Sequence, residues 1–357
     1  MFNPSRLRLA RRRRRLSSKE FADLIGVSPV TVTRLEKANN EPDQSTFEAI
    51  ISTLGFPREF FMGPDIDELE KDAVSFRSLT DMTAREREAA LAAGSLAYLL
   101  CDWVSERFNL PNPDLVDLSS ERNPEAAATT LRRHWALGEQ PVSDMVKLLE
   151  SKGVRVFSLA ENTKNVDAFS CWRNQVPYVF LNTFKSTERS RFDAAHELGH
   201  LILHKHGGPR QGRSAEIEAN NFASAFLMPA ADVKSRIPIA GSLENLIESK
   251  KRWGVSLSAL TYRLHKLGRL TDWQYRSYCI DINRRGYREK EPNSAPREES
   301  VVWKKVFSEL WNEKVSKHHI AAELNIPTDE IENLVFGLVG LPSRSPKQER
   351  PSLRVVR

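Results

Sequence analysis

The sequence predicts a multidomain chain with an all-α N-terminal domain, a helical connector, an α+β domain and a helical C-terminal region. At 357 residues it is long enough for two or three domains. Its first 62 residues read as short capped helices. From residue 142, short strand-like runs alternate with helical patterns. We therefore expect domains at 1–62, 63–140, 141–268 and 269–342, and a disordered tail over 343–357.

The composition excludes several classes of protein. Hydrophobic residues make up 40% of the chain, which is enough for globular cores. No apolar run approaches the roughly 18 residues that a membrane span needs, so no membrane partner is expected. The arginine-rich N-terminus is followed by no apolar segment and is not a secretory signal. Three scattered cysteines suggest reduced thiols and a cytoplasmic protein.

The N-terminal domain begins with seven arginines between residues 6 and 15, interleaved with leucines that predict a helix packed on one face. A capped helix follows and ends at Gly26. The next helix has Ser28 as its N-cap and Pro29 as its first residue. This is helix-turn-helix spacing. Five side chains of the second helix are expected to face a DNA major groove: Ser28, Val30, Thr31, Thr33 and Arg34.

The same stretch resembles the XRE/Cro-C1 repressor domain over nearly all of its length. The shared pattern is Ser-x-x-x-Phe-Ala-x-x-Ile-Gly-Val-Ser-x-x-Thr-Val-x-Arg-Leu-Glu, which starts at Ser17 and ends at Glu36. The resemblance implies binding to double-stranded DNA. A homodimer is the default expectation, because operator symmetry usually mirrors a protein dimer. A domain that has lost DNA binding and serves protein contacts is the alternative.

The connector is predicted to be helical. One long helical pattern runs over residues 83–108, Pro111 and Pro113 break it, and another helix is expected over 120–135. The α+β domain then starts with a helix over 143–152. Strands are expected over 154–157, 168–172 and 177–182, with a turn at Asn174 and Gln175 and a further helix over 186–204.

This last helix carries the residues most indicative of chemistry. His196 and His200 lie four residues apart, so both imidazoles point from one face of the helix and can bind one metal ion. Glu197 follows the first histidine. His-Glu-x-x-His is the zincin spacing, in which the glutamate is the general base of a metallopeptidase. The apolar flanks indicate burial, and a buried polar group needs a partner such as a metal.

A zinc site of this kind needs a third protein ligand. Glu216 and Glu218 both lie in the helix expected before Pro229, but they point about 200° apart, so only one can face the metal. We choose Glu216, because Asn220 then lies one turn further on the same face and can orient a ligating histidine. Glu218 is expected to be a solvated surface charge.

Residues 142–267 resemble the ImmA/IrrE family of metallopeptidases. The resemblance rests on Arg191-Phe192, the His196–His200 motif, His204, Glu216-x-x-Ala219-Asn220-x-Phe222-Ala223 and Leu227-Met228-Pro229. It implies a gluzincin-like fold and a Zn²⁺ site with His196, His200 and Glu216 as ligands and Glu197 as base. Known members cleave helix-turn-helix repressors, so a protein substrate of that kind is also implied.

The expected reaction is hydrolysis of a peptide bond. Zn²⁺ would polarise the scissile carbonyl and acidify its water, and Glu197 would move the proton to the leaving amine. The substrate could be a repressor, a partner or the chain itself. A sheet edge near the metal would let an extended peptide add as a strand. The alternative is a transcription factor or sensor whose peptidase-like domain binds a partner or signal without proteolysis.

Several roles stay open at this stage. Tyr262, Arg263 and Arg191 are candidates for stabilising the oxyanion, and His204 is either at the rim of the site or a hydrogen-bonded structural residue. The basic, aromatic segment 250–290 suits either nucleic acid or packing against the α+β domain. Residues 316–331 repeat the apolar spacing of residues 18–33, which suggests a second helix-turn-helix-like unit.

Overall fold

The N-terminal helices form because each has its own start and stop signals. In the computed structural model, which describes residues 1–69, 74–76, 83–159, 168–204 and 212–340, Ser17 and Glu20 make a capping box at the start of α2. Gly26 ends that helix with a φ of +73°, and Ser28 caps α3. The predicted helix-turn-helix is confirmed. The domain comprises α1 (Pro4–Arg13), α2 (Ser18–Ile25), α3 (Pro29–Glu36), α4 (Gln44–Leu54) and the short η1 (Arg58–Met62).

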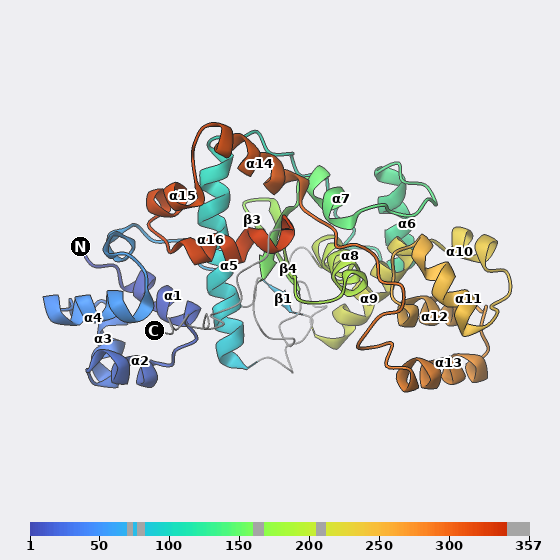
Figure 1. The fold of residues 1–357 in the computed structure, drawn as a ribbon, viewed down its shortest axis with the longest axis horizontal. Helices are drawn as coiled ribbons and strands as arrows, with labels where there is room; N and C mark the ends of the chain where they lie inside the picture. The colour runs from blue at the N-terminus through green and yellow to red at the C-terminus, as the bar shows by residue number, and fades with distance from the viewer. Residues whose placement is uncertain (70–73, 77–82, 160–167, 205–211, 341–357) are drawn as a thin grey trace, which may run out of the picture.

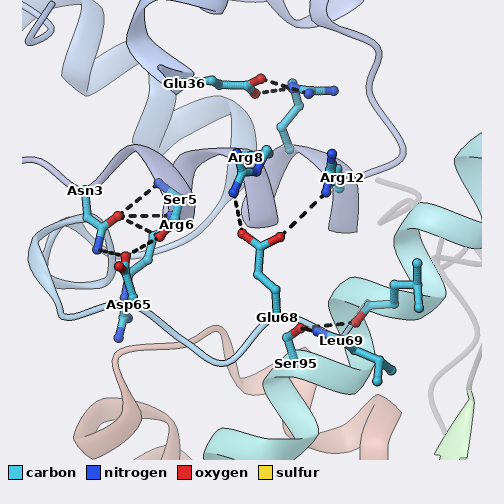
Figure 2. Close-up of polar contacts among 12 residues, drawn as sticks. Asn3, Ser5, Arg6, Arg8, Arg12, Glu36, Asp65, Glu68, Leu69 and Ser95 are labelled. Atoms are coloured by element: carbon cyan, nitrogen blue, oxygen red, sulfur yellow. Dashed lines mark hydrogen bonds and ion pairs between the residues drawn. The ribbon is translucent and has the colours of Figure 1, made fainter. Parts of the chain in front are cut away.

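The arginines of α1 bind to the protein itself. Arg11 pairs with Glu36 at the end of α3, where its Nε lies 2.6 Å from the carboxylate. Arg8 and Arg12 reach Glu68, which follows the domain, with nitrogen–oxygen distances of 2.5 and 3.8 Å. Figure 2 shows Glu68 on one side of α1, within reach of Arg8 and Arg12, and Glu36 on the other side. Part of the basic run therefore anchors the domain and is not presented to DNA.

The connector contains one long helix that runs through the middle of the molecule. α5 (Ala84–Ser105) starts with a capping box between Thr83 and Glu86. Its buried residues occur on all sides, as expected of a helix enclosed by other elements. In Figure 1 it stands between the N-terminal helices and the sheet. The shorter α6 (Pro124–His134) packs against a later helix, α9 (Arg213–Leu227).

The sheet has four strands in the order β1-β3-β4-β2. β3 (Phe169–Arg173) and β4 (Val176–Asn182) form an antiparallel hairpin, and Asn174 and Gln175 in its turn have φ angles of +49° and +63°. These angles are typical of the tight turn that the sequence predicts. β2 (Arg155–Leu159) runs parallel to β4 and follows α7 (Met145–Ser151). The three predicted strands are confirmed, whereas β1 (Ser75–Phe76) was not expected.

Two helices pack together beside the sheet and carry the candidate site. α8 (Thr187–Leu203) contacts β3, β4 and α9 (Arg213–Leu227). A Cβ atom on Gly199 would lie only 3.0 Å from the Phe222 ring and 3.3 Å from the Cα of Ala219. Glycine at this position therefore lets α9 approach α8 closely.

The following helices lie at the far end from the N-terminal domain (Figure 1). They are α10 (Ala230–Arg236), α11 (Leu243–Ser249), the short η3 (Lys250–Arg252), α12 (Leu257–Lys266) and α13 (Asp272–Arg284). Packing accounts for some of the aromatic side chains in this region, since the Tyr275 ring stacks on the His265 ring with centroids 4.5 Å apart. It does not explain Trp273, which is 76% exposed on α13.

The C-terminal helices return to the N-terminal domain. They are α14 (Val301–Asn312), α15 (Lys317–Leu324), α16 (Thr328–Val335) and η4 (Phe336–Leu338). Asn325, with a φ of +54°, ends α15 and leads into α16, so a helix-turn-helix-like pair is present. α16 contacts α5 and β2. The predicted tail, 343–357, lies outside the described residues. Among the described residues, no helix is both long enough and apolar enough to cross a membrane.

A buried ion-pair cluster joins α16 to α1. The Glu330 carboxylate is fully buried and accepts hydrogen bonds from Arg13 Nε at 2.7 Å and from an Arg14 terminal nitrogen at 2.8 Å. We expect Glu330→Ala to lower the free energy of unfolding by about 3–5 kcal/mol, because it removes one partner of a buried pair. Denaturant unfolding followed by circular dichroism measures this change.

Asp329→Asn is the matched control for this prediction. Its carboxylate is 55% exposed and lies 3.4 Å from Arg14, so removing its charge should cost less than about 1 kcal/mol. Equal losses of stability in the two variants would contradict a structural role for the buried pair.

Candidate metal centre

The two motif histidines lie on the buried face of α8. Ser186 caps this helix by accepting a hydrogen bond from the backbone N–H of Arg189. The helix places His196 and His200 one turn apart, with ring centroids 4.7 Å from each other. Both side chains are almost fully buried between the sheet and α9. Local helix geometry therefore brings the two imidazoles together, as the sequence predicts.

Three side chains converge on one point in this region. The Nε2 atoms of His196 and His200 are 3.0 Å apart. The two carboxylate oxygens of Glu216 each lie 3.3 Å from one of these nitrogens. Among the described residues, His196, His200 and Glu216 form a group in which one potential ligand atom from each side chain lies within 4.8 Å of the other two. Two imidazoles and a carboxylate are the donor set of a catalytic zinc site, so the residues fit a divalent cation.

The electrostatics of His200 and Glu216 suit metal ligands. Burial lowers the pKa of His200 to about 4, so its ring is neutral near pH 7. Burial acts to raise the pKa of Glu216, but hydrogen bonds with His196 and His200 outweigh it and lower that pKa to about 2. Metal ligands must be deprotonated, and both groups already are at neutral pH.

Polar partners orient the far side of each imidazole. The Asn220 side-chain oxygen lies 3.1 Å from Nδ1 of His196, which is the contact expected of Asn220 from the sequence. The second ring meets another histidine, since Nδ1 of His200 lies 3.0 Å from Nδ1 of His204. Such partners fix ring orientation and the tautomer of a ligating histidine.

Glu218 is not the solvated surface charge that the sequence suggested. Its carboxylate lies 3.1 Å from Nε2 of His204, so it forms the outer end of a chain that runs through His204 to His200. Sequence spacing could not find this contact, because the packing of α8 on α9 brings together residues fourteen positions apart. Of the two glutamates, Glu216 is the one that lies beside both motif histidines.

Glu197 has a partner that the sequence did not indicate. Its side chain is fully buried, and the hydroxyl of Ser170 donates to its carboxylate at 2.7 Å. Ser170 also lies 3.3 Å from the backbone carbonyl oxygen of Glu197. β3 therefore positions the glutamate of the motif. An isolated serine in a strand pattern gives no signal for this role.

The residues expected to face DNA lie on α3. Ser28 and Thr33 bond within the helix, since Ser28 accepts from the Thr31 amide at 3.1 Å and Thr33 donates to the Pro29 carbonyl at 3.0 Å. The side chain of Val30 is 59% exposed, and Arg34 is exposed too. The outer face of α3 is therefore open in this structure.

Two segments of the chain match models of known protein families. Residues 7–61 match the helix-turn-helix family model. Residues 149–265 match the model of peptidase family M78, described as the IrrE N-terminal-like domain. The resemblance predicted from the sequence is confirmed. No curated protein matches the chain.

The M78-like segment contains all three open candidates for oxyanion stabilisation, and two of them, Arg191 and Arg263, have structural bonds. Arg191 donates to the Trp253 carbonyl at 3.1 Å and pairs with Glu298. Arg263 donates to the Met228 carbonyl at 3.0 Å. Both side chains are buried, so neither guanidinium is presented to a substrate. The third candidate, Tyr262, is partly exposed.

Proposed function

We propose that this protein is a DNA-binding regulator fused to a zinc metallopeptidase that hydrolyses a peptide bond in a protein substrate. The convergence of the His196 and His200 ring nitrogens on the Glu216 carboxylate carries the proposal. These three residues would hold Zn²⁺, and Asn220 would keep the first imidazole in place. Bound zinc supplies Lewis acidity toward a carbonyl oxygen and acidifies water.

Glu197 would carry the proton during hydrolysis. Its carboxylate accepts a proton from the attacking water and then delivers it to the amine that leaves. The hydrogen bond from Ser170 keeps the carboxylate in one orientation, and burial excludes competing solvent. The substrate class implied by the family resemblance is a helix-turn-helix repressor, a partner protein or this chain itself. The proposed location is the cytoplasm.

A chelator experiment tests whether the activity depends on a metal. We expect the purified chain to cleave a complex peptide mixture, measured by mass spectrometry of the new termini. Treatment with a zinc chelator should abolish cleavage, and added Zn²⁺ should restore it, because the ligand set suits zinc. Cleavage that persists unchanged through chelation would contradict a metallopeptidase.

The N-terminal domain would bind double-stranded DNA through α3, as a homodimer on a symmetric site. The exposed Val30, Thr33 and Arg34 form the face available to a major groove. We expect Arg34→Ala to weaken binding by about 1–3 kcal/mol, the usual cost of losing an arginine contact to a base. A duplex selected from a random pool by the wild-type chain serves as the probe, and fluorescence anisotropy measures its affinity.

Arg284→Ala is the control for DNA binding. It makes the same change in net charge, but the arginine is exposed on α13, outside the N-terminal domain. Its affinity for the selected duplex should stay close to that of the wild type. If both variants lose affinity to the same extent, the contact is a general effect of charge and α3 does not read the DNA.

A further inference from the structure

The side of β3 that faces away from β4 is occupied by a segment of the same chain. β4 lies on one side of β3, and β1 pairs antiparallel with the other side. In this register Ser75 lies opposite Ser170, and Phe76 lies opposite Phe169. In Figure 1, β1 is labelled in the middle of the molecule, just below β3 and β4 in this view. A strand can pair on only two sides, and β4 takes one side of β3. An extended peptide could therefore pair with β3 only where β1 now lies.

The occupied edge lies next to the proposed base. Ser170, directly opposite Ser75, is the residue whose hydroxyl donates to the Glu197 carboxylate at 2.7 Å. Neighbouring strands lie about 4.7–4.9 Å apart, so β1 is one strand spacing away from the residue that positions Glu197. A peptide recognised by strand addition at this edge would place its backbone beside the catalytic machinery.

The segment that precedes β1 is attached to the N-terminal domain. The Asp65 carboxylate accepts hydrogen bonds from Ser5 at 2.6 Å and Asn3 at 3.0 Å, both at the start of α1. The Leu69 amide donates to the Ser95 hydroxyl of α5 at 3.0 Å, so the chain is also fixed to the central helix. Figure 2 shows both sets of contacts. β1 begins six positions after Leu69.

We propose that β1 is a built-in occupant of the substrate position, and that the substrate is an extended segment that pairs antiparallel with β3 at Phe169 and Ser170. A substrate in trans must displace β1 before it can be cleaved. This inference rests on the proposed peptidase function for its catalytic consequence, but the occupied edge is independent of hydrolysis. Asp65 and Glu68, which precede β1 in the chain, contact α1 of the N-terminal domain.

Replacing β1 by prolines opens the edge. In an antiparallel pair the N–H groups of alternate residues face the partner strand, so one of Ser75 and Phe76 donates toward β3. The double variant Ser75→Pro, Phe76→Pro removes that donor whichever residue supplies it. The matched control, Ser75→Ala with Phe76→Ala, keeps both N–H groups. A glycine pair at the same positions weakens the strand without constraining φ and should fall between the two.

The first measurement uses binding alone. A fluorescein-labelled peptide with the sequence of residues 70–80 is titrated into each variant in a Glu197→Gln background, so that nothing is cleaved. The apparent affinity for the peptide is reduced by the fraction of molecules in which β1 leaves β3 unpaired. If that fraction is at most roughly a tenth, the proline variant should bind the peptide about tenfold more tightly, or better. The alanine control should bind as weakly as the parent. Equal affinity of the proline and alanine variants would overturn the proposal.

The second measurement uses chains that retain Glu197. The initial rate of cleavage of the peptide mixture should rise about tenfold in the proline variant and stay unchanged in the alanine variant. Tighter binding with an unchanged rate, in chains that do cleave, would overturn a substrate position for β1. Tighter binding with no cleavage by any chain would support the occupied edge and refute the proposed peptidase function instead.

Discussion

Glu197→Gln should lower kcat for peptide hydrolysis by about 10²–10⁴-fold, the usual contribution of a general base. Glutamine is nearly the same size but cannot take a proton from water. The variant should keep its metal, because the atoms that converge belong to His196, His200 and Glu216. The measurements are steady-state cleavage of a peptide identified in the mixture and zinc content by atomic spectroscopy.

Ser170→Ala provides the comparison for this prediction. It removes the hydrogen bond of 2.7 Å to the Glu197 carboxylate but leaves the proton acceptor in place. Its kcat should fall less than that of Glu197→Gln, with zinc content again unchanged. Wild-type rates in the Glu197→Gln chain would refute the role of Glu197 as base.

The Glu197→Gln variant also separates the two functions considered for the protein. If it also leaves regulation in the cell untouched, the domain acts as a sensor or binding module without proteolysis. Loss of regulation would instead favour the peptidase, provided that DNA binding by the purified variant is normal.

Glu216→Ala should lose zinc, whereas Glu218→Ala should largely keep it. Both changes delete a carboxylate from α9, two positions apart, so they form a matched pair. The carboxylate oxygens of Glu216 lie 3.3 Å from the Nε2 atoms of both motif histidines, whereas the Glu218 carboxylate lies 3.1 Å from Nε2 of His204. Removal of an outer partner of a ligand typically costs 10–100-fold in metal affinity, roughly, and loss of the ligand itself should cost more.

Competition with a chelator of known zinc affinity measures both dissociation constants. Far-UV circular dichroism of the metal-free chains checks that α9 remains folded. The assignment of the third ligand would be wrong if the Glu218 variant loses affinity as severely as the Glu216 variant, or if the Glu216 variant retains it.

Local patterns in the sequence were sufficient for the features that depend on neighbouring residues. Capping residues, Gly26 and the apolar periodicity predicted the helices of the N-terminal domain, because these signals act within one or two turns. The four-residue spacing of His196 and His200 is likewise a property of one helix. The side-by-side position of Glu216 and Asn220 on α9 follows from the same periodicity.

Only the tertiary structure decided which segments meet. Glu218 reaches His204, Ser170 bonds Glu197, and Glu330 is buried against Arg13 because helices and strands pack at particular angles and registers. No local pattern in one segment encodes the distance to another segment that is far away in the chain. The two-residue β1 was missed for the same reason, since its pairing with β3 depends on where α5 and the N-terminal domain hold the connector. The sequence by itself thus determined the chemistry available on α8, and the fold determined which partners orient it and which strand lies beside it.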